Sequence, residues 1–412
     1  MSPHAAAHTL AFVESPVQLL NVLEWAHAHA HGRPSPPTGP PAPAGPPAPP
    51  PAGPPATVPA PVPAAPAQAP APPPTPPPTP APAPPPEARS WLTVVVLSPT
   101  DPMTRGQLRR MAELARDEGY QVRWEEARGG AAAPFRTIGG LAPLLRRAGR
   151  LVMGDPFSRY VQLLLTITTA RDLVVVDDGT ATMEFVAQLA RGERLVRWHR
   201  KGGRPAARDL VLAPVSAAAR RRLAPRGTRR RVEVFSAMPI AEAPAGVAVT
   251  ANGFGWTRAR FGPPRVLAGA DLVGTSLVET GVVEDAPYLE AVHALAAAHG
   301  ARRYFAHRRE SPDKLRRLAA RTGLEIVRPD LPLELVARRG PVGRTLLSFP
   351  STVVHTLPPA LAGTGVRVAV CDIDPDWLTA QASPRAQGFL SGVTGTARYA
   401  DRLGLARTAP SG

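Results

Sequence analysis

Residues 173–185 read LVVVDDGTATMEF, an apolar run that stops at two aspartates and a glycine. The run Leu173–Val176 predicts a strand that is buried on both faces. Similar runs recur along the chain and alternate with amphipathic stretches, as in Leu92–Leu97 followed by Met103–Glu118. This alternation predicts an α/β fold of two doubly wound domains, with parallel sheets facing across a cleft. Ligands bind at the carboxyl ends of such strands, so the residues after each strand are the candidates for chemistry.

A proline-rich segment interrupts this pattern. More than half of the 54 prolines lie between Pro34 and Pro86, and residues 33–88 carry two large apolar side chains, Val58 and Val62. Such a segment cannot bury enough surface to offset its ordering entropy. We therefore expect a disordered insertion that serves as a spacer, with a ligand for a proline-recognising partner as the alternative.

The ordered parts are predicted to form two domains. The first spans residues 8–200 apart from the insertion, and the second spans residues 209–385. An arginine- and glycine-rich connection with little periodicity separates them. Residues 386–412 are expected to form a tail that packs back on the first domain.

The chain is basic, with 48 Lys and Arg against 32 Asp and Glu and a formal net charge of +16. Lys201 and Lys314 are its only lysines, so the excess is arginine. With abundant alanine, proline and glycine, this composition indicates a GC-rich coding bias as much as selection for charge. Net charge is therefore weak evidence for nucleic-acid binding, although a basic surface attracts phosphorylated ligands and anionic membranes.

Cysteine usage and the N-terminal segment bear on localisation. The single cysteine, Cys371, cannot form an intramolecular disulfide and fits a reducing compartment. The N-terminal segment lacks the basic region of a secretion signal, and its apolar run is broken by Glu14. No apolar stretch is long enough to span a bilayer. We expect a cytoplasmic protein that at most contacts the inner face of the membrane.

The first candidate motif is the Asp177-Asp178-Gly179 turn after the strand Leu173–Val176. Paired carboxylates at a strand end suit a general base or a metal, and glycine lets the backbone turn sharply close to a ligand. The alternative is that one aspartate caps the next helix. A cap needs one carboxylate, so the pair with glycine favours function.

Two further candidates lie in the second half. His307 follows the predicted strand Arg303–Ala306 and could pair with a phosphate or donate a proton, with Arg308 beside it. Ser351 and Thr352 open a predicted helix, where two hydroxyls and free amides suit a phosphate. Taken singly, the first is an ordinary histidine and the second an N-cap serine.

The order of these motifs resembles the bacterial CMP-sialic-acid-dependent sialyltransferases and polysialyltransferases, which have two Rossmann-like domains in the GT-B arrangement. The resemblance implies that Asp178 is the general base, with Asp177 and Gly179 shaping the turn or the acceptor side. It implies that His307 meets the donor phosphate and acts as general acid. Ser351 and Thr352 would hold the same phosphate. The first domain would bind the acceptor and the second the donor.

Further segments agree with the resemblance. The sequence Pro332-Leu333-Glu334 matches an element whose glutamate binds the donor ribose, and FVESPVQLL places Ser15 and Gln18 on the acceptor side. Two weaker candidates are Asp155, for the acceptor or a turn, and Ser276, for the donor or local backbone. The family usually has proline after the histidine, whereas this chain has Arg308, whose guanidinium could bind phosphate.

The implied function is an inverting transfer of sialic acid from CMP-sialic acid to a glycan hydroxyl, with no metal or cofactor. The expected partners are a nucleotide-sugar donor, a glycan acceptor and an anionic membrane surface. One alternative is a transferase that uses another nucleotide-activated sugar, and a degenerate inactive relative is a second. The alternative from a different class is a nucleic-acid-binding protein that uses the cluster Arg220–Arg231. Aromatic residues make up 5% of the chain and no nucleic-acid-reading motif is present, which disfavours that class.

Overall fold

The structure is a computed structural model that describes residues 8–30, 89–128, 133–196, 213–227, 229–240, 242–380, 382, 384–397 and 400–403. The predicted disordered insertion 33–88 lies outside the described residues. Much of the predicted connection between the domains, 197–212, lies outside them as well.

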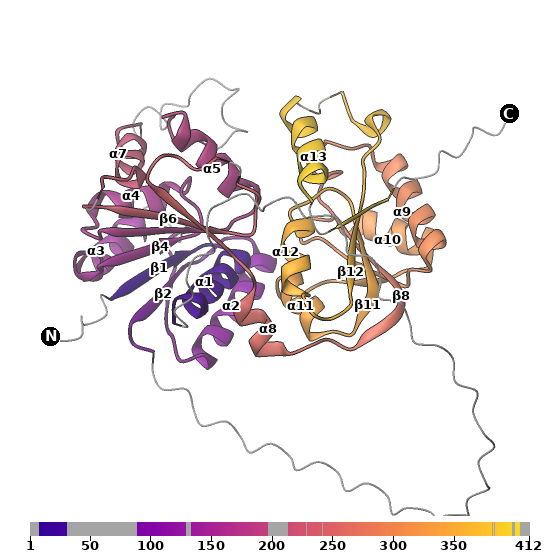
Figure 1. Cartoon of the computed structure of the whole chain (residues 1–412), viewed down its shortest axis with the longest axis horizontal. Helices are drawn as coiled ribbons and strands as arrows, with labels where there is room; N and C mark the ends of the chain where they lie inside the picture. The colour runs from indigo at the N-terminus through magenta and orange to yellow at the C-terminus, as the bar shows by residue number, and fades with distance from the viewer. Residues whose placement is uncertain are drawn as a thin grey trace, which may run out of the picture. The chain divides into compact units, whose positions relative to one another are not determined.

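The first half of the chain builds a seven-stranded parallel sheet in the order β3–β2–β1–β4–β5–β6–β7 (Figure 1). Its strands are β1 (Thr9–Val13), β2 (Leu92–Leu97), β3 (Gln121–Glu125), β4 (Arg150–Met153), β5 (Asp172–Val176), β6 (Arg231–Ser236) and β7 (Val247–Ala251). The chain order reverses between β1 and β4. The carboxyl ends of β1, β4 and β5 therefore lie side by side.

Helices cover both faces of this sheet because alternate strand side chains point to opposite sides. In β5, Leu173 and Val175 join a core cluster with one set of helices, whereas Val174 and Val176 join the cluster on the other face. The first set is α3 (Ala133–Arg147), α4 (Arg159–Ile167), α5 (Thr180–Ala190) and α7 (Ala213–Leu223). The second set is α1 (Pro16–Ala30) and α2 (Pro102–Asp117).

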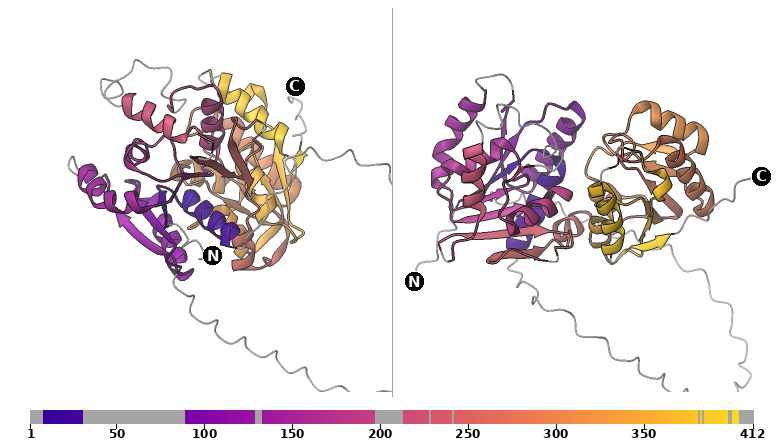
Figure 2. Two further views of the ribbon diagram at one scale, coloured as in Figure 1. Left: turned by 60° about the vertical axis from the view of Figure 1, so that its left-hand side comes forward. Right: turned by 90° about the horizontal axis from the view of Figure 1, so that it is seen from above.

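The second half builds a six-stranded parallel sheet in the order β10–β9–β8–β11–β12–β13. Its strands are β8 (Val266–Val273), β9 (Arg303–Phe305), β10 (Glu325–Val327), β11 (Val342–Ser348), β12 (Arg367–Cys371) and β13 (Asp401–Leu403). One face is covered by α9 (Asp285–His299) and α10 (Pro312–Thr322). The other is covered by α11 (Leu333–Arg339), α12 (Val353–Ala360) and α13 (Pro384–Thr396). Figure 2 shows both sheets with their flanking helices from two further directions.

The two halves share contacts and belong to one compact unit. Leu331, Leu335 and Ala360 of the second half pack in the core cluster that α1 and α2 form in the first. The short helix α8 (Gly255–Phe261), between β7 and β8, packs on α1 and α11. The Gln107 side chain also donates to the Pro329 carbonyl at 2.7 Å. These contacts fix the carboxyl ends of the two sheets relative to each other.

The predicted α/β class with two parallel sheets is confirmed, but the predicted domain limits need correction. β6 and β7 lie after residue 209 and nevertheless extend the first sheet. The first sheet ends at Ala251 and the second begins at Val266. The sequence did not indicate that the first domain continues through the arginine-rich stretch. The helix α7 in this stretch buries Ser216, Ala219 and Leu223, and Leu223 is the one large apolar side chain among them, so its hydrophobic pattern is weak.

The prediction for the C-terminal tail was wrong over its described part. β13 pairs with β12 in the second sheet, and Val393 of α13 packs on Val354 and Val370. The tail therefore completes the second sheet instead of packing on the first. None of the described helices is long and apolar enough to cross a bilayer.

Candidate functional site

The predicted site residues follow the carboxyl ends of neighbouring strands in both sheets. In the first sheet they follow the neighbours β1, β4 and β5. In the second sheet they follow β9, β8 and β11, which are also neighbours, and the turn before α11 adds Glu334. The topology therefore brings residues that are distant in the sequence to two sheet edges.

Asp177 holds the turn after β5. It is 2% exposed, and its carboxylate accepts hydrogen bonds from the Gly179 and Ala237 amides, both at 3.1 Å. The Asn21 side chain donates to its carbonyl at 2.9 Å. Burial raises the pKa of this carboxyl to about 6, and the hydrogen bonds oppose the shift. The contacts of Asp177 are therefore those of a turn-shaping residue.

Asp178 is the more exposed aspartate of the pair. Its backbone amide donates to the Thr182 hydroxyl at 2.8 Å, which fixes the start of α5. Gly179 has a φ of 64°, a left-handed conformation that glycine adopts without strain. The turn therefore presents the Asp178 side chain while its neighbours hold the backbone.

This turn lies against the second half of the molecule. A Cβ atom built on Gly179 would lie 3.1 Å from Cγ2 of Thr352. Desolvation lowers the pKa of the Arg308 guanidinium, and the negative charges of Asp178 and Asp101 act in the opposite direction. The turn at Gly179 therefore lies next to Thr352, and Asp178 is near enough for its charge to act on the Arg308 guanidinium.

His307 is half-buried at the end of β9. Its Nδ1 accepts a hydrogen bond from the Arg309 amide at 3.2 Å, so the neutral ring carries its proton on Nε2. Desolvation, followed by the positive charges of Arg308, Arg309 and Lys314, lowers the pKa of the imidazole to about 4. His307 is therefore a neutral hydrogen-bond donor at neutral pH.

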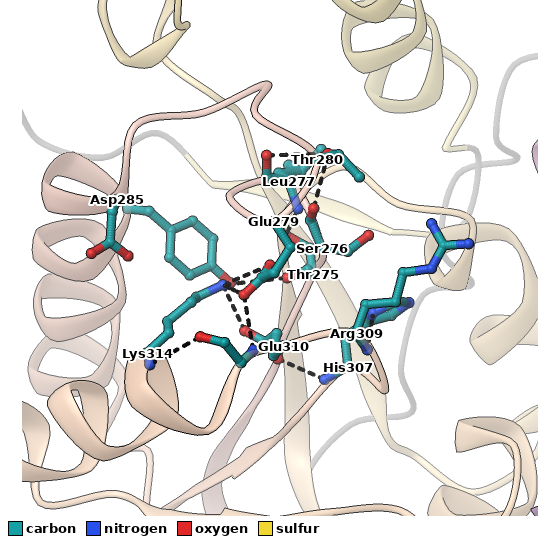
Figure 3. Close-up of polar contacts among 12 residues, drawn as sticks. Thr275, Ser276, Leu277, Glu279, Thr280, Asp285, His307, Arg309, Glu310 and Lys314 are labelled. Carbon is teal, nitrogen blue, oxygen red and sulfur yellow. Dashed lines mark hydrogen bonds and ion pairs between the residues drawn. The ribbon is translucent and has the colours of Figure 1, made fainter. Parts of the chain in front are cut away.

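A buried ionic network supports the His307 turn. Glu310, 2% exposed, accepts from the His307 amide at 2.6 Å through Oε2 and from the Tyr304 hydroxyl at 2.6 Å through Oε1. Its Oε1 also pairs with Nζ of Lys314 at 2.8 Å. Figure 3 shows Glu310 lying between His307 and Lys314. A buried pair of this kind holds its surroundings tightly because breaking it would leave an unpaired charge.

Lys314 connects this turn to the one that follows β8. Its ammonium group donates to the Thr275 carbonyl at 3.4 Å and pairs with Glu279 (Figure 3). It also lies 4.3 Å from the centre of the Tyr288 ring. A Cβ on Gly274 would lie 2.2 Å from Oε2 of Glu310. The two strand-end turns therefore pack through one glycine and one buried lysine.

The serine turn follows β11. Ser351 Oγ lies 3.4 Å from the Ser348 hydroxyl, and Thr352 is the residue before α12. The side chain of Thr352 makes no capping hydrogen bond at the amino end of α12. Thr352 therefore does not act as a side-chain N-cap, and an anion at this end of α12 would meet the positive end of the helix dipole.

The two other donor-side candidates differ in their setting. Glu334 is 6% exposed and accepts a hydrogen bond from the Thr356 hydroxyl, and burial raises the pKa of its carboxyl. Ser276 is half-buried next to the His307 network, and its carbonyl accepts from the Thr280 amide at 2.9 Å. Both residues remain candidates for donor contacts.

The acceptor-side candidates form a buried set of turns at β1 and β4. Ser15 Oγ accepts from the Gln18 amide at 3.2 Å, and the Gln18 side chain accepts from the Glu14 amide at 2.7 Å. Gln18 fills the space over Gly154, and Asp155 accepts from the Phe157 amide at 2.9 Å. These contacts shape the edge of the first sheet.

Sequence reasoning missed Glu14 as a site residue. Its carboxylate accepts from the Ser158 hydroxyl at 2.7 Å and pairs with Arg128 at 3.0 Å. Burial raises the pKa of this carboxyl, and the charge of Arg128 opposes the shift. The available signal was a carboxylate directly after a buried strand, the same signal that identified Asp177. Glu310 and Lys314 were missed as well, because HRRESPDK has the composition of a surface loop.

Comparisons with known proteins leave the family open. No protein-family model matches the chain, and no curated protein matches its sequence. Among solved structures, the α/β-galactoside α-2,3-sialyltransferase of Photobacterium phosphoreum is similar with a TM-score of 0.45 and 7% identity, over 96% of this chain and 98% of that one. A sialyltransferase from Photobacterium damsela has a TM-score of 0.40 and 9% identity, over 97% and 82% of the two chains. Values this low establish neither the fold nor the function of this chain.

Proposed function

We propose that the protein is a glycosyltransferase that moves sialic acid from CMP-sialic acid to a glycan hydroxyl with inversion. The observation that carries the proposal is the close approach of Gly179 to Thr352, and the charge of Asp178 also acts on the Arg308 guanidinium. The turn that carries the candidate base thereby lies near the residues that we propose bind the donor phosphate. The donor identity rests on the sequence resemblance.

In this mechanism Asp178 takes the proton of the acceptor hydroxyl. The acceptor oxygen attacks C2 of the sugar as the bond from C2 to the phosphate oxygen breaks, and the bonding electrons leave with the phosphate. Asp177, Asn21 and Thr182 hold the backbone of the turn, so the carboxylate of Asp178 is positioned before the substrate binds.

Charge that gathers on the departing phosphate would be stabilised from the second half. The donors are Nε2–H of His307, the Arg308 guanidinium, the hydroxyls of Ser351 and Thr352, and the amino end of α12. A pKa of about 4 for His307 favours hydrogen bonding over proton donation at neutral pH. The general-acid role expected for His307 is therefore replaced, in this proposal, by neutral hydrogen-bond donation.

Nucleotide binding tests the donor class. CMP should raise the melting temperature more than UMP, UDP or GDP, because it is part of the proposed donor. A ligand present at 100 times its Kd stabilises a folded protein by about 2.7 kcal/mol. Stabilisation by a uridine or guanosine nucleotide in place of CMP would identify another donor. No stabilisation by any of the four would contradict a nucleotide-sugar transferase.

The variant Asp178→Asn tests the base. We expect kcat to fall on the order of 10²- to 10⁴-fold while CMP affinity is kept, because the amide cannot accept the proton. Asp117→Asn, the same change at an exposed position of α2, is the control and should leave kcat unchanged. Wild-type kcat in Asp178→Asn would rule out this residue as the base.

A further inference from the structure

A small hollow in the first half is lined mainly by arginine. Its volume is about 260 Å³. It lies between the end of α4, the helix α7 and the segment before β6. The lining residues are Thr166, Ala218, Arg221, Arg222, Arg226 and Arg230.

The hollow lies at the sheet edge opposite the candidate active site. β6 begins at Arg231, which is in register with Asp172 and Arg150, the first residues of β5 and β4. The hollow is therefore at the amino ends of the strands, whereas the site residues follow the carboxyl ends. Five strand residues at about 3.3 Å each separate the two edges by roughly 16 Å.

Like charges are held close together in this hollow. Arg230 donates to the carbonyls of Arg221 and Arg222 at 2.7 and 3.2 Å, and Arg222 donates to the Thr168 carbonyl. Desolvation lowers the pKa of Arg230, and the positive charges of Arg222 and Arg226 lower it further. Carbonyls orient these side chains without neutralising them, and no acidic residue is among those that line the hollow. A bound anion would relieve this repulsion.

The surroundings indicate a surface that meets a bilayer. Ile167, next to the lining residue Thr166, is 37% exposed and is one of three large apolar side chains exposed among the described residues. Arg146 and Arg147 at the end of α3 and Arg171 before β5 are exposed at the same edge. Exposed arginines around an exposed apolar side chain are typical of membrane-interface segments.

We propose that this arginine-lined edge binds the phosphate headgroups of anionic lipids and that Ile167 enters the interface. Binding would be peripheral and would leave the opposite edge of the sheet, with the candidate active site, facing away from the lipid. The proposal does not depend on the transfer reaction.

Vesicle co-sedimentation of the full chain tests the proposal. The protein should partition onto vesicles of phosphatidylcholine with phosphatidylglycerol, bind poorly to phosphatidylcholine alone and dissociate as salt is raised. The variant R221Q/R226Q removes two of the four arginines that line the hollow. It should weaken binding about thirtyfold at low salt, since each arginine near the surface contributes about 1 kcal/mol. Ile167→Ser should weaken binding severalfold.

The control R316Q/R321Q removes the same charge from α10, where both arginines are exposed and paired with acids. It should bind vesicles like the wild type, and thermal melts should show that every variant is folded. If the control variant lost as much vesicle binding, the effect would come from net charge alone, and the proposal would be overturned. Absence of wild-type binding would overturn it as well. Tighter binding to random-sequence duplex DNA than to vesicles at matched phosphate concentration would assign the surface to nucleic acid instead.

Discussion

The surroundings of His307 change the chemical role that we assign to it. The sequence suggested a proton donor, but a ring whose pKa is about 4 carries no extra proton at neutral pH. The Arg309 amide fixes its tautomer and leaves Nε2–H as a donor. In the proposed reaction the residue therefore stabilises negative charge without transferring a proton.

Substitutions at His307 distinguish these two roles. The amide nitrogen of glutamine can take the place of Nε2, so His307→Gln should keep more CMP affinity and more kcat than His307→Ala. If His307 were an acid, glutamine would fail as badly as alanine. Calorimetric CMP titration and steady-state rates provide the measurement.

The same residue makes a contribution to stability that depends on pH. Its folded pKa is lowered from 6.5 to about 4, so this contribution is present above pH 6.5 and is lost as the pH falls from 6.5 to 4. An NMR titration of the ring should show its midpoint near pH 4. A midpoint near 6.5 would mean that the ring is solvated and unconstrained.

At the scale of the elements, the turns after β8 and β9 behave as one unit. Gly274 makes this possible, because its missing side chain leaves room for Glu310 and Tyr304, whose hydroxyl would lie 2.7 Å from an added Cβ. The buried carboxylate then binds the His307 amide. The orientation of His307 thus depends on a glycine in a different strand-end turn.

Gly274→Ala should therefore lower the free energy of unfolding by roughly 1–3 kcal/mol, the usual cost of overpacking a core. CMP affinity should fall with it. Gly106→Ala in α2 is the control, because nothing lies within 4 Å of the added Cβ and alanine favours a helix by up to about 1 kcal/mol. Urea denaturation measures both variants, and equal stability of the two would contradict the close packing.

The sequence predicted the elements better than their partners. The predicted ranges Leu92–Leu97, Leu173–Val176 and Met103–Glu118 match β2, β5 and α2 to within one residue at each end, because each has strong hydrophobic patterning. α5, α7, β6 and β7 were not predicted. In β6, RVEVFS follows directly on the arginine-rich cluster and carries two charged residues, so it lacks the uninterrupted apolar run that indicated the other strands.

Part of the candidate site could be predicted from the rule that ligands bind at the carboxyl ends of parallel strands. That rule identified Asp178, His307 and Thr352: Thr352 lies next to Gly179 in the Asp178 turn, and His307 and Thr352 follow the two strands that flank β8. It could not identify Glu310 or Lys314, because their burial comes from long-range packing against the β8 turn. A charged residue in a loop carries no local sign that it will be buried.

At the scale of the whole molecule, Glu24 joins the two halves. It lies in α1, is 1% exposed, and accepts hydrogen bonds from the Trp256 and Thr257 amides at 2.9 Å and from the Thr257 hydroxyl. These residues belong to α8, the connection into the second sheet. Burial raises the pKa of Glu24 from 4.5 to about 7, and the hydrogen bonds oppose the shift.

A raised carboxyl pKa stabilises the folded state below the unfolded value, and this contribution is lost as the pH rises through 7. The wild type should therefore lose on the order of 1–3 kcal/mol of stability, relative to Glu24→Gln, between pH 5 and pH 8. Denaturation at the two pH values measures the difference, and Glu113→Gln, at an exposed position, is the control. A constant difference between wild type and Glu24→Gln would contradict the raised pKa.

The ends of α1 and β2 offer an engineering opportunity. The Trp91 carbonyl, just before β2, accepts from the amide of Thr9, and Trp25 near the end of α1 packs on the Trp91 ring with centroids 6.1 Å apart. Ala30 and Arg89 therefore both lie near the edge of the first sheet at which its strands begin. A fluorescent reporter or an affinity module spliced between Ala30 and Arg89 would be carried there, well clear of the chemistry.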